Sequence, residues 1–420
     1  MTASAQPDQA RALVCLAFDE LGRVPAGIWG THRSVAGRAF RMTGPIGRVV
    51  QMAHDGISGA VYGSLRGGTR GMGSAAAAAV RGRPGRALST TPVGGAAIGA
   101  VNGLIGDVLE RDGSVLHEPM AVRVDGRRVA PDRRSVAAAF PAAGPRLVVF
   151  VHGLMETELG WKVGARRGRE PYGDRLAREL DCTPLYVRYN TGRHVSDNGR
   201  SLADLLEAVV GAWPVEVEEV ALVGHSMGGL VSRSACHQAA LEQAAWVRRV
   251  RHVISLGTPH MGAPLAQGVH YLSAAFHALP ETRPLGAFLR RRSAGIRDLR
   301  HGSLVDADWK DRDPDALAAV ACEEVPLLEG ATHCFVAATV TRGGRDPLAR
   351  LIGDMLVLAP SASGRSRRRR IPFDEEYGVH LGGTHHLALL NHPAVYDKLR
   401  EWLAASAPAS GSGAPRSPAR

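Results

Sequence analysis

The stretch that decides the fold of this 420-residue chain runs Glu219-Val220-Ala221-Leu222-Val223-Gly224-His225-Ser226-Met227-Gly228-Gly229. Its first five residues are typical of a buried strand, and the residues after Gly229 continue as a helix. A strand that turns this sharply into a helix places Ser226 in a strained backbone conformation and needs small residues at 224 and 228. The Gly-x-Ser-x-Gly spacing in this context predicts that Ser226 is a nucleophile whose hydroxyl projects over a sheet edge.

A second informative loop follows an earlier apolar strand, residues 147–151, and begins His152-Gly153-Leu154-Met155. Attack by a serine on a carbonyl creates an oxyanion, which two backbone N–H groups stabilise. We expect the N–H of Met227 to supply one donor and the N–H of Leu154 to supply the other. His152 and His225 stand at strand ends ahead of or inside these turns, so we expect them to position the loops and not to act as a base.

Short apolar, β-branched runs recur along the chain and are separated by helix-like segments such as 173–180 and 202–213; the runs are 147–151, 185–189, 219–223, 252–256 and 334–339. Continuous apolar strands that alternate with helices predict an α/β fold with a mostly parallel, doubly wound sheet and helices on both faces. Ahead of these units, Asp125-Gly126 lies between two short runs and predicts a β-hairpin.

Composition divides the chain into three parts. Residues 1–112 are rich in Gly, Ala and Ser and predict a helical accessory segment, residues 113–405 form the predicted catalytic domain, and residues 406–420 read as a disordered Pro/Ser/Gly tail. The apolar stretch 94–109 is interrupted by polar residues and falls short of the ~18 uninterrupted apolar residues of a spanning helix. We therefore expect it to pack on the catalytic domain.

These motifs, together with the run 257–262 (Gly-Thr-Pro-His-Met-Gly), resemble α/β-hydrolase lipases and esterases over about residues 146–403. The segments 296–302, 353–357 and 386–393 look like a bacterial lipase-like branch related to the PGAP1-type deacylases. The resemblance implies an α/β-hydrolase fold and a catalytic triad in the order Ser, acid, His. It places the acid at Asp354, in a Gly-Asp-x-x-Val segment, and the base at His386, which heads a His-x-x-Leu-Leu-x-His-Pro segment.

The chemistry requires these residue types because a neutral serine is a poor nucleophile until an imidazole accepts its proton and a carboxylate orients that imidazole. Two assignments stay open. Asp354 lies well past the last apolar strand, so Asp346 is a rival acid. His385 adjoins His386, and only one of the two should face Ser226; we favour His386.

Two segments have both a functional and an ordinary interpretation. Residues 265–310 interleave apolar side chains with Arg290, Arg291 and Arg292 where hydrolases carry caps, so they predict either an amphipathic lid over an acyl pocket or a helical insertion packed on the core. The basic run of Arg365 and residues 367–370 is either a solvated loop or a contact for anionic lipid headgroups.

Composition and residue spacing also argue against several kinds of partner and site. The chain has 51 Lys and Arg against 40 Asp and Glu, a net charge of +11, but these charges carry no nucleic-acid recognition motif and few aromatic residues interleave with them, so we expect no nucleic-acid partner. The 5 Cys lack CxxC spacing and no His has metal-ligand spacing, so we expect neither a disulfide framework nor a metal or cofactor. A basic n-region is missing, which favours a cytoplasmic protein, with peripheral membrane association as an option.

Three functions compete at this point. The first prediction is a serine hydrolase that cleaves acyl or lipid esters through an acyl-enzyme. The alternative is an acyltransferase or thioesterase with the same triad, since these differ only in whether water or another acceptor reaches the acyl-enzyme. A non-catalytic lipid-surface protein on a hydrolase fold is disfavoured by the complete set of candidate triad residues.

Overall fold

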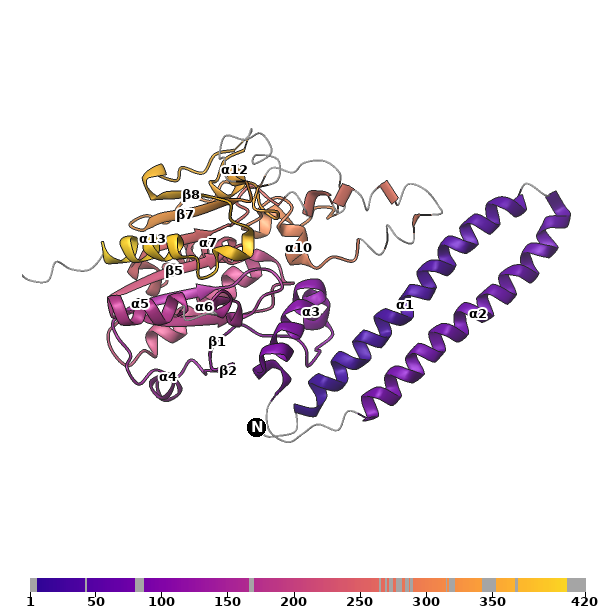
Figure 1. Cartoon of the computed structure of the whole chain (residues 1–420), viewed down its shortest axis with the longest axis horizontal. Coiled ribbons are helices and arrows are strands. Elements are labelled where there is room, and N and C mark those ends of the chain that lie inside the picture. Colours follow the sequence, from indigo (N-terminus) through magenta and orange to yellow (C-terminus); the bar gives the residue numbers. More distant parts are fainter. Residues whose placement is uncertain are drawn as a thin grey trace, which may run out of the picture.

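The computed structural model describes residues 6–41, 44–79, 87–165, 170–263, 290–314, 316, 322–341, 353–366 and 369–405, together with short runs between 266 and 287. Within these ranges the chain forms a long helical hairpin at its amino-terminal side and an α/β body (Figure 1). The rival acid Asp346, most of the predicted lid before residue 290 and the predicted tail 406–420 lie outside the described residues.

An eight-stranded sheet forms the centre of the body, in the order β2-β1-β4-β3-β5-β6-β7-β8. The strands are β1 (Ala121–Val124), β2 (Arg127–Arg128), β3 (Arg146–Val151), β4 (Thr183–Arg188), β5 (Glu219–His225), β6 (Val250–Leu256), β7 (Thr332–Thr339) and β8 (Gly378–Gly382). Strands β3 to β8 pair in parallel, whereas β1 pairs antiparallel with β4 and with β2. The mostly parallel sheet predicted from the sequence is confirmed.

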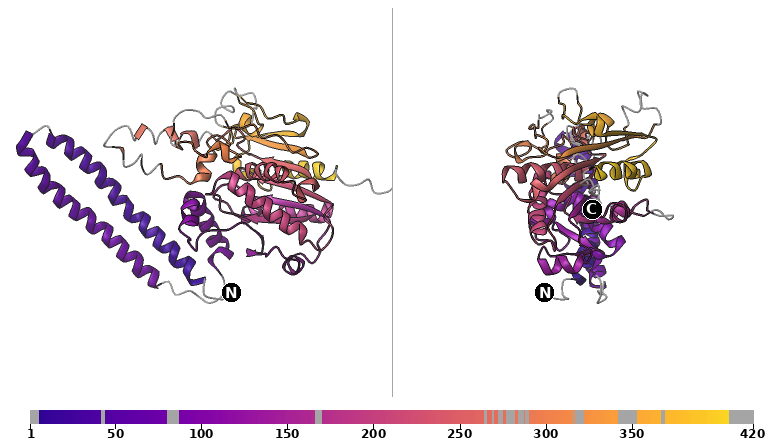
Figure 2. Two further views of the ribbon diagram at one scale, coloured as in Figure 1. Left: turned by 180° about the vertical axis from the view of Figure 1, so that it is seen from behind. Right: turned by 90° about the vertical axis from the view of Figure 1, so that its left-hand side faces the viewer.

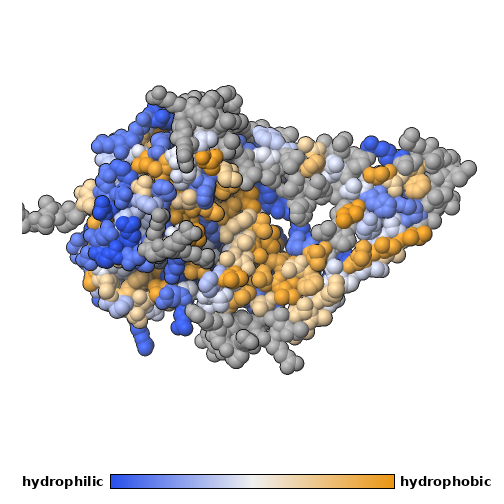
Figure 3. All heavy atoms as spheres, viewed as in Figure 1, coloured by the Kyte–Doolittle hydropathy of each residue, from blue (hydrophilic) through white to orange (hydrophobic). Residues whose placement is uncertain are grey.

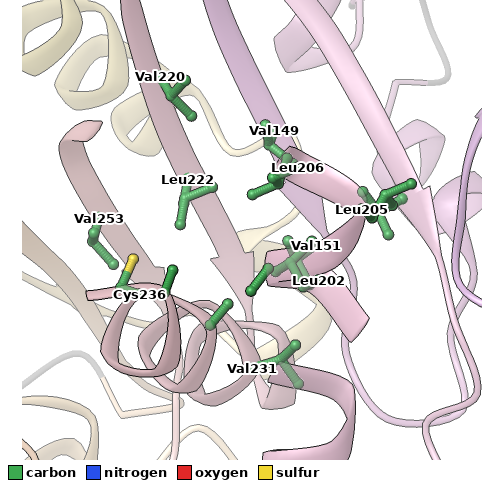
Figure 4. Packing of buried hydrophobic residues seen from close by; sticks show 14 of the residues in the cluster. Val149, Val151, Leu202, Leu205, Leu206, Val220, Leu222, Val231, Cys236 and Val253 are labelled. Carbon is green, nitrogen blue, oxygen red and sulfur yellow. The ribbon is translucent and has the colours of Figure 1, made fainter. Parts of the chain in front are cut away.

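Helices cover both faces of the sheet because every central strand is apolar on both sides. The helices of the body are α4 (Arg133–Ala139), α5 (Tyr172–Leu180), α6 (Val195–Gly211), α7 (Met227–Leu241), α10 (Ala294–Asp298), α12 (Ala359–Ala362) and α13 (Pro393–Ala404). Val149 and Val151 point to one face and pack with α6 and α7 (Figure 4). Phe150, which points to the other face, packs in a second cluster with Leu176 of α5 and Leu399 of α13. The alternation of side chains along β3 thus builds two cores.

Arg146, the first residue of β3, forms hydrogen bonds that link the centre of the sheet to segments distant in the sequence. Its guanidinium donates to the carboxylate of Glu219 at 3.0 Å, to the carbonyl of Leu180 at 3.0 Å and to the carbonyl of Leu403 in α13 at 2.6 Å. Three acceptors satisfy this half-buried charge, so the position of α13 is fixed by a polar contact as well as by apolar packing.

Two long helices, α1 (Gln6–Arg41) and α2 (Gly44–Ala79), run antiparallel and extend away from the body (Figure 1 and the left view of Figure 2). The hairpin meets the body near the start of α1. Gln9 accepts a hydrogen bond from the N–H of Ser89 at 3.2 Å, and residues Ala12, Leu13 and Leu16 pack against a small core of Ile98, Leu109 and Leu116. This contact leaves most of the length of the hairpin away from the sheet.

Helix α3 (Pro92–Arg111) lies directly on the body, after a short 3₁₀ turn, η1 (Leu88–Thr90). Its glycines allow close approach: a Cβ on Gly99 would lie 2.7 Å from Cγ2 of Thr157, and one on Gly103 would lie 2.4 Å from Cγ of Met155. Among the described helices, α3 alone is long and apolar enough to cross a membrane, and 44% of that apolar window is buried in the body. Its buried Asn102 donates to the carbonyls of Ile98 and Leu116.

Candidate active site

Ser226 stands at the turn from β5 into α7 with φ 52° and ψ −121°, a strained conformation for a residue with a side chain. The glycines around it are required by close backbone contacts. A Cβ on Gly224 would lie 2.4 Å from the nitrogen of Gly229, and one on Gly228 would lie 2.1 Å from the carbonyl oxygen of Val151. The N–H of Ser226 donates to the carbonyl of Leu256 at 2.8 Å, which anchors the turn to the end of β6.

Asp354 and His386 form a buried pair. The Nδ1 of His386 lies 2.7 Å from Oδ2 of Asp354, and the two side chains are only 4% and 1% exposed. The other carboxylate oxygen accepts the backbone N–H groups of Leu356 at 3.0 Å and Val357 at 2.7 Å, which fixes its orientation. His385 is exposed at the surface. The structure therefore brings Asp354 to His386 and leaves His385 outside the pair.

A backbone contact explains how Asp354 reaches this place despite its distance along the chain from β7. The N–H of Val340, just past β7, donates to the carbonyl of Gly353 at 2.9 Å, so the chain returns to the carboxyl end of that strand. Gly353 adopts φ +61°, and a Cβ there would lie 2.1 Å from the carbonyl oxygen of Val357. The tight turn that presents Asp354 thus depends on glycine.

Ser226, Asp354 and His386 lie at the same edge of the sheet, where the carboxyl ends of the parallel strands meet. Gly257, immediately after β6, adopts φ +60°, and a Cβ on it would lie 3.1 Å from Cε1 of His386. The ring of His225, the residue before Ser226, has its centroid 4.8 Å from that of His386. The role of Gly257 was missed by our sequence reasoning, although its motif was recognised; the missing side chain makes room for the imidazole of His386.

Residues 152–157, the loop that is predicted to carry one oxyanion donor and is called the oxyanion loop below, lie against Ser226. A Cβ on Gly153 would be 3.0 Å from Cβ of Ser226, and Met155 adopts φ 62° and donates its N–H to Oγ1 of Thr191 at 3.2 Å. Leu154 lies between Gly153 and Met155, and Met227 is the first residue of α7 after Ser226. Both predicted oxyanion donors are therefore on segments that adjoin the serine, and their role stays a prediction.

His152 supports this loop from within the core. It is fully buried, and burial lowers the pKa of its imidazole to about 4, so the ring is neutral. Its Nδ1 lies 2.9 Å from the carbonyl oxygen of Gly153, and its own carbonyl accepts the hydroxyl of Tyr189 at 2.8 Å. These contacts indicate that His152 holds the loop 152–157 in place.

Sequence reasoning missed one acidic residue of the oxyanion loop altogether. Glu156 has a carboxylate oxygen 3.0 Å from Nδ1 of His225, and its second oxygen accepts the N–H of Gly153 at 2.9 Å. An acid three residues past the loop glycine was the available signal, but an exposed carboxylate has the same appearance in a sequence. No group of three or more His, Cys, Asp or Glu among the described residues is placed to hold a metal.

Comparison with known proteins gives one family match, to the PGAP1-like alpha/beta domain over residues 145–309. The structure is similar to a lipase from Bacillus licheniformis in its propeptide form (21% identity over 63% of this chain and 51% of that chain, TM-score 0.42). It is also similar to an esterase from Pyrobaculum calidifontis (16% identity over 63% of this chain and 75% of that chain, TM-score 0.34). A third similar structure is EstA from Clostridium botulinum (11% identity over 62% of this chain and 87% of that chain, TM-score 0.38). The chain spans about half the length of the Bacillus lipase. No curated protein matches it.

Proposed function

We propose that this chain, which has the α/β-hydrolase fold and is similar to the PGAP1-like alpha/beta domain over residues 145–309, is a serine hydrolase that cleaves acyl or lipid esters. The observation that carries the proposal is the 2.7 Å contact between Asp354 and His386 at the sheet edge where Ser226 occupies its strained turn. These are the three residue types that nucleophilic acyl transfer requires.

In the proposed reaction, Oγ of Ser226 attacks the ester carbonyl while Nε2 of His386 accepts the serine proton. Asp354 accepts a hydrogen bond from the Nδ1–H of His386 and stabilises the imidazolium that forms. The N–H groups of Leu154 and Met227 stabilise the negative oxygen of the tetrahedral intermediate. Collapse breaks the bond to the alcohol, which leaves with the proton from His386. Water then attacks the carbonyl of the acyl-enzyme while Nε2 of His386 accepts a water proton; the bond from the acyl group to Oγ of Ser226 breaks, His386 returns the proton to Oγ, and the carboxylic acid leaves.

The test is labelling with a fluorophosphonate together with a chain-length series of p-nitrophenyl esters. Ser226→Ala should abolish labelling and lower kcat about 10⁶-fold, the size of effect seen when a triad acts as a unit. Ser135→Ala, in α4 on the body, is the matched control and should retain both. Labelling at a different serine in the intact protein would contradict the proposal, and the product of a reaction with added alcohols separates hydrolysis from acyl transfer.

We further propose that the α1–α2 hairpin contacts lipid surfaces, which would bring the body to an ester in a membrane. Large apolar side chains are exposed on both helices: Leu21, Ile28, Val35, Met52, Ile57, Val61, Leu65 and Met72. Hydrophobic atoms gather along the hairpin (Figure 3), and a depression of about 560 Å³ opens on α2 beside Val61 and Leu65. The two helices contain 8 Arg and 4 acidic residues, a net charge of 8 − 4 = +4. Each cation near an anionic surface contributes about 1 kcal/mol.

Flotation with vesicles of phosphatidylcholine and phosphatidylglycerol tests this contact. The double variant Ile57→Asp with Leu65→Asp should lose vesicle binding, because it places two carboxylates on the apolar face. Val93→Asp, at an exposed apolar position outside the hairpin, is the control and should bind as the unaltered protein does. All three proteins should hydrolyse a short soluble ester equally. Equal flotation of the double variant and the control would refute the lipid contact.

A further inference from the structure

A carboxylate and an imidazole stand behind the Ser226 turn and take no part in the proposed reaction. Glu156 belongs to the oxyanion loop, and the fully buried His225 is the last residue of β5. The Nδ1 of His225 lies 3.0 Å from Oε1 and 3.1 Å from Oε2 of Glu156. On its other side, the Nε2 of His225 lies 3.4 Å from the carbonyl oxygen of His386. The ring therefore lies between two acceptors.

Acceptors on both sides favour the doubly protonated form of the ring. A neutral imidazole carries one N–H, so only the imidazolium form of His225 donates on both sides. Burial by itself lowers the pKa of His225, but the charge and the hydrogen bond of Glu156 outweigh burial and raise it. Burial by itself raises the pKa of Glu156, whereas the charge and hydrogen bond of His225 and the N–H of Gly153 lower it to about 2. The two groups form a buried ion pair.

The pair touches each of the loops that the proposed reaction needs. Glu156 accepts the N–H of Gly153 at 2.9 Å and so holds the oxyanion loop closed on itself. A Cβ on Gly153 would meet both Cβ of Ser226 at 3.0 Å and Cδ of Glu156 at 3.2 Å, which shows how tightly this glycine lies between the two. His225 is covalently joined to Ser226 and also reaches the main chain of His386.

We infer that Glu156 and His225 are positioning residues, which lock the oxyanion loop, the serine turn and the base loop into one arrangement. The inference rests on the proposed ester hydrolysis, because the loops it aligns are those of that reaction. An oxyanion donor acts only when it lies at hydrogen-bond distance from the position where charge develops. A rigid contact from Glu156 to the N–H of Gly153 sets the direction of the next peptide, whose N–H belongs to Leu154.

Kinetics on a short soluble ester test the positioning role. Glu156→Ala should lower kcat about 10²-fold and change KM less than about threefold, because it disturbs transition-state donors more than substrate binding. Glu156→Gln keeps an acceptor for Gly153 and an amide that donates to a neutral His225, so its kcat should fall only about tenfold. Glu218→Ala removes an exposed acid before β5 and is the matched control. Near-UV circular dichroism and Tm establish that each variant is folded.

A folded Glu156→Gln variant with unchanged kcat, together with a folded Glu156→Ala variant within about twofold of the unaltered protein, would overturn the inference. A loss that appears wholly in KM would also overturn it, since a positioning residue of the oxyanion loop acts on kcat. If Glu156→Ala does not fold, the Glu156→Gln comparison decides alone, because the shape of the side chain is preserved.

Long-range ¹H–¹⁵N spectra of the histidine rings provide a readout that needs no activity. The carboxylates of Glu156 and Asp354 and the backbone carbonyl of His386 raise the pKa of His225. The rings of His386 and Trp161 also adjoin it, with centroids 4.8 Å and 6.3 Å away. His225 should keep protons on both nitrogens to a higher pH in the unaltered protein than in Glu156→Gln, because the carboxylate of Glu156 raises its pKa. Loss of the second proton at the same pH in both proteins would overturn the ion pair. A protein that reacts with no fluorophosphonate would contradict the proposed function alone, and the ring spectrum would still decide whether the pair exists.

Discussion

Replacing Gly103 by Ala should damage both the stability and the activity of the protein, although Gly103 is in α3 and far from Ser226 in the sequence. A Cβ at this position would lie 2.4 Å from Cγ of Met155 and 3.0 Å from its Cα and its backbone nitrogen. The side chain of Met155 can rotate away, but its backbone can move only if the peptide from Leu154 moves with it. We expect a cost of about 1–3 kcal/mol in unfolding free energy, which is typical of overpacking in a filled interior.

The same substitution on α2 gives the matched control. Gly67 is helical and exposed, and a Cβ there meets no atom within 4 Å, so Gly67→Ala should leave unchanged or raise the free energy of unfolding, by up to about 1 kcal/mol. Urea unfolding and kcat on a soluble ester measure both effects. Loss of one oxyanion donor lowers kcat about 10²–10³-fold, which is the upper bound for a displaced Leu154. Equal stability and equal kcat for Gly103→Ala and Gly67→Ala would show that α3 does not brace the oxyanion loop.

Three further outcomes follow from the candidate site. His386→Ala should lower kcat by several orders of magnitude, whereas His385→Ala, at an exposed position, should leave most of it; the reverse result would transfer the role of base to His385. Asp354→Asn should lower kcat about 10⁴-fold through the wrong tautomer of His386, and should leave fluorophosphonate labelling of the serine slow but detectable. Burial lowers the pKa of His152 and of His333 to about 4, below the value near 6.5 of an unfolded chain, so the native state resists their protonation. Their contribution to stability is complete above about pH 6.5 and is lost as the pH falls toward 4, and His333→Gln should flatten the fall of the urea midpoint over that range. An unchanged slope would rule out this histidine as a source of the acid sensitivity.

Local sequence patterns predicted most of the fold. The Gly-x-Ser-x-Gly run between an apolar strand and a helix specifies its own geometry, because the strained turn at Ser226 and the close contacts of Gly224 arise within a few residues. The strand and helix alternation likewise predicted the parallel sheet, which is confirmed. Periodicity is a property of neighbouring residues and is visible in one sequence.

The contacts that the sequence did not reveal are those between distant segments. The return of the chain to Val340 brings Gly353, and with it Asp354, to the end of β7, and no local pattern encodes that hydrogen bond. The pairing of Glu156 with His225 joins residues 69 positions apart, so neither side chain differs locally from a solvated one. The apolar stretch 94–109 was predicted to pack on the catalytic domain, but nothing in its sequence indicated that its partner there is the oxyanion loop.

The contact between Arg146 and Leu403 has a consequence for how the chain is made. The two residues are 257 positions apart, so at about 5–20 residues per second the ribosome needs about 13–50 s to synthesise the acceptor after the donor. Until α13 emerges, the sheet face that includes Phe150 has no cover from Leu399 and Trp402, and the guanidinium of Arg146 lacks one of its three acceptors. Every strand of the sheet has then been translated, while this apolar face is covered by α5 but not yet by α13. We therefore expect the nascent protein to bind chaperones that recognise exposed apolar surface during this interval, and to acquire a fixed site only after α13 leaves the ribosome.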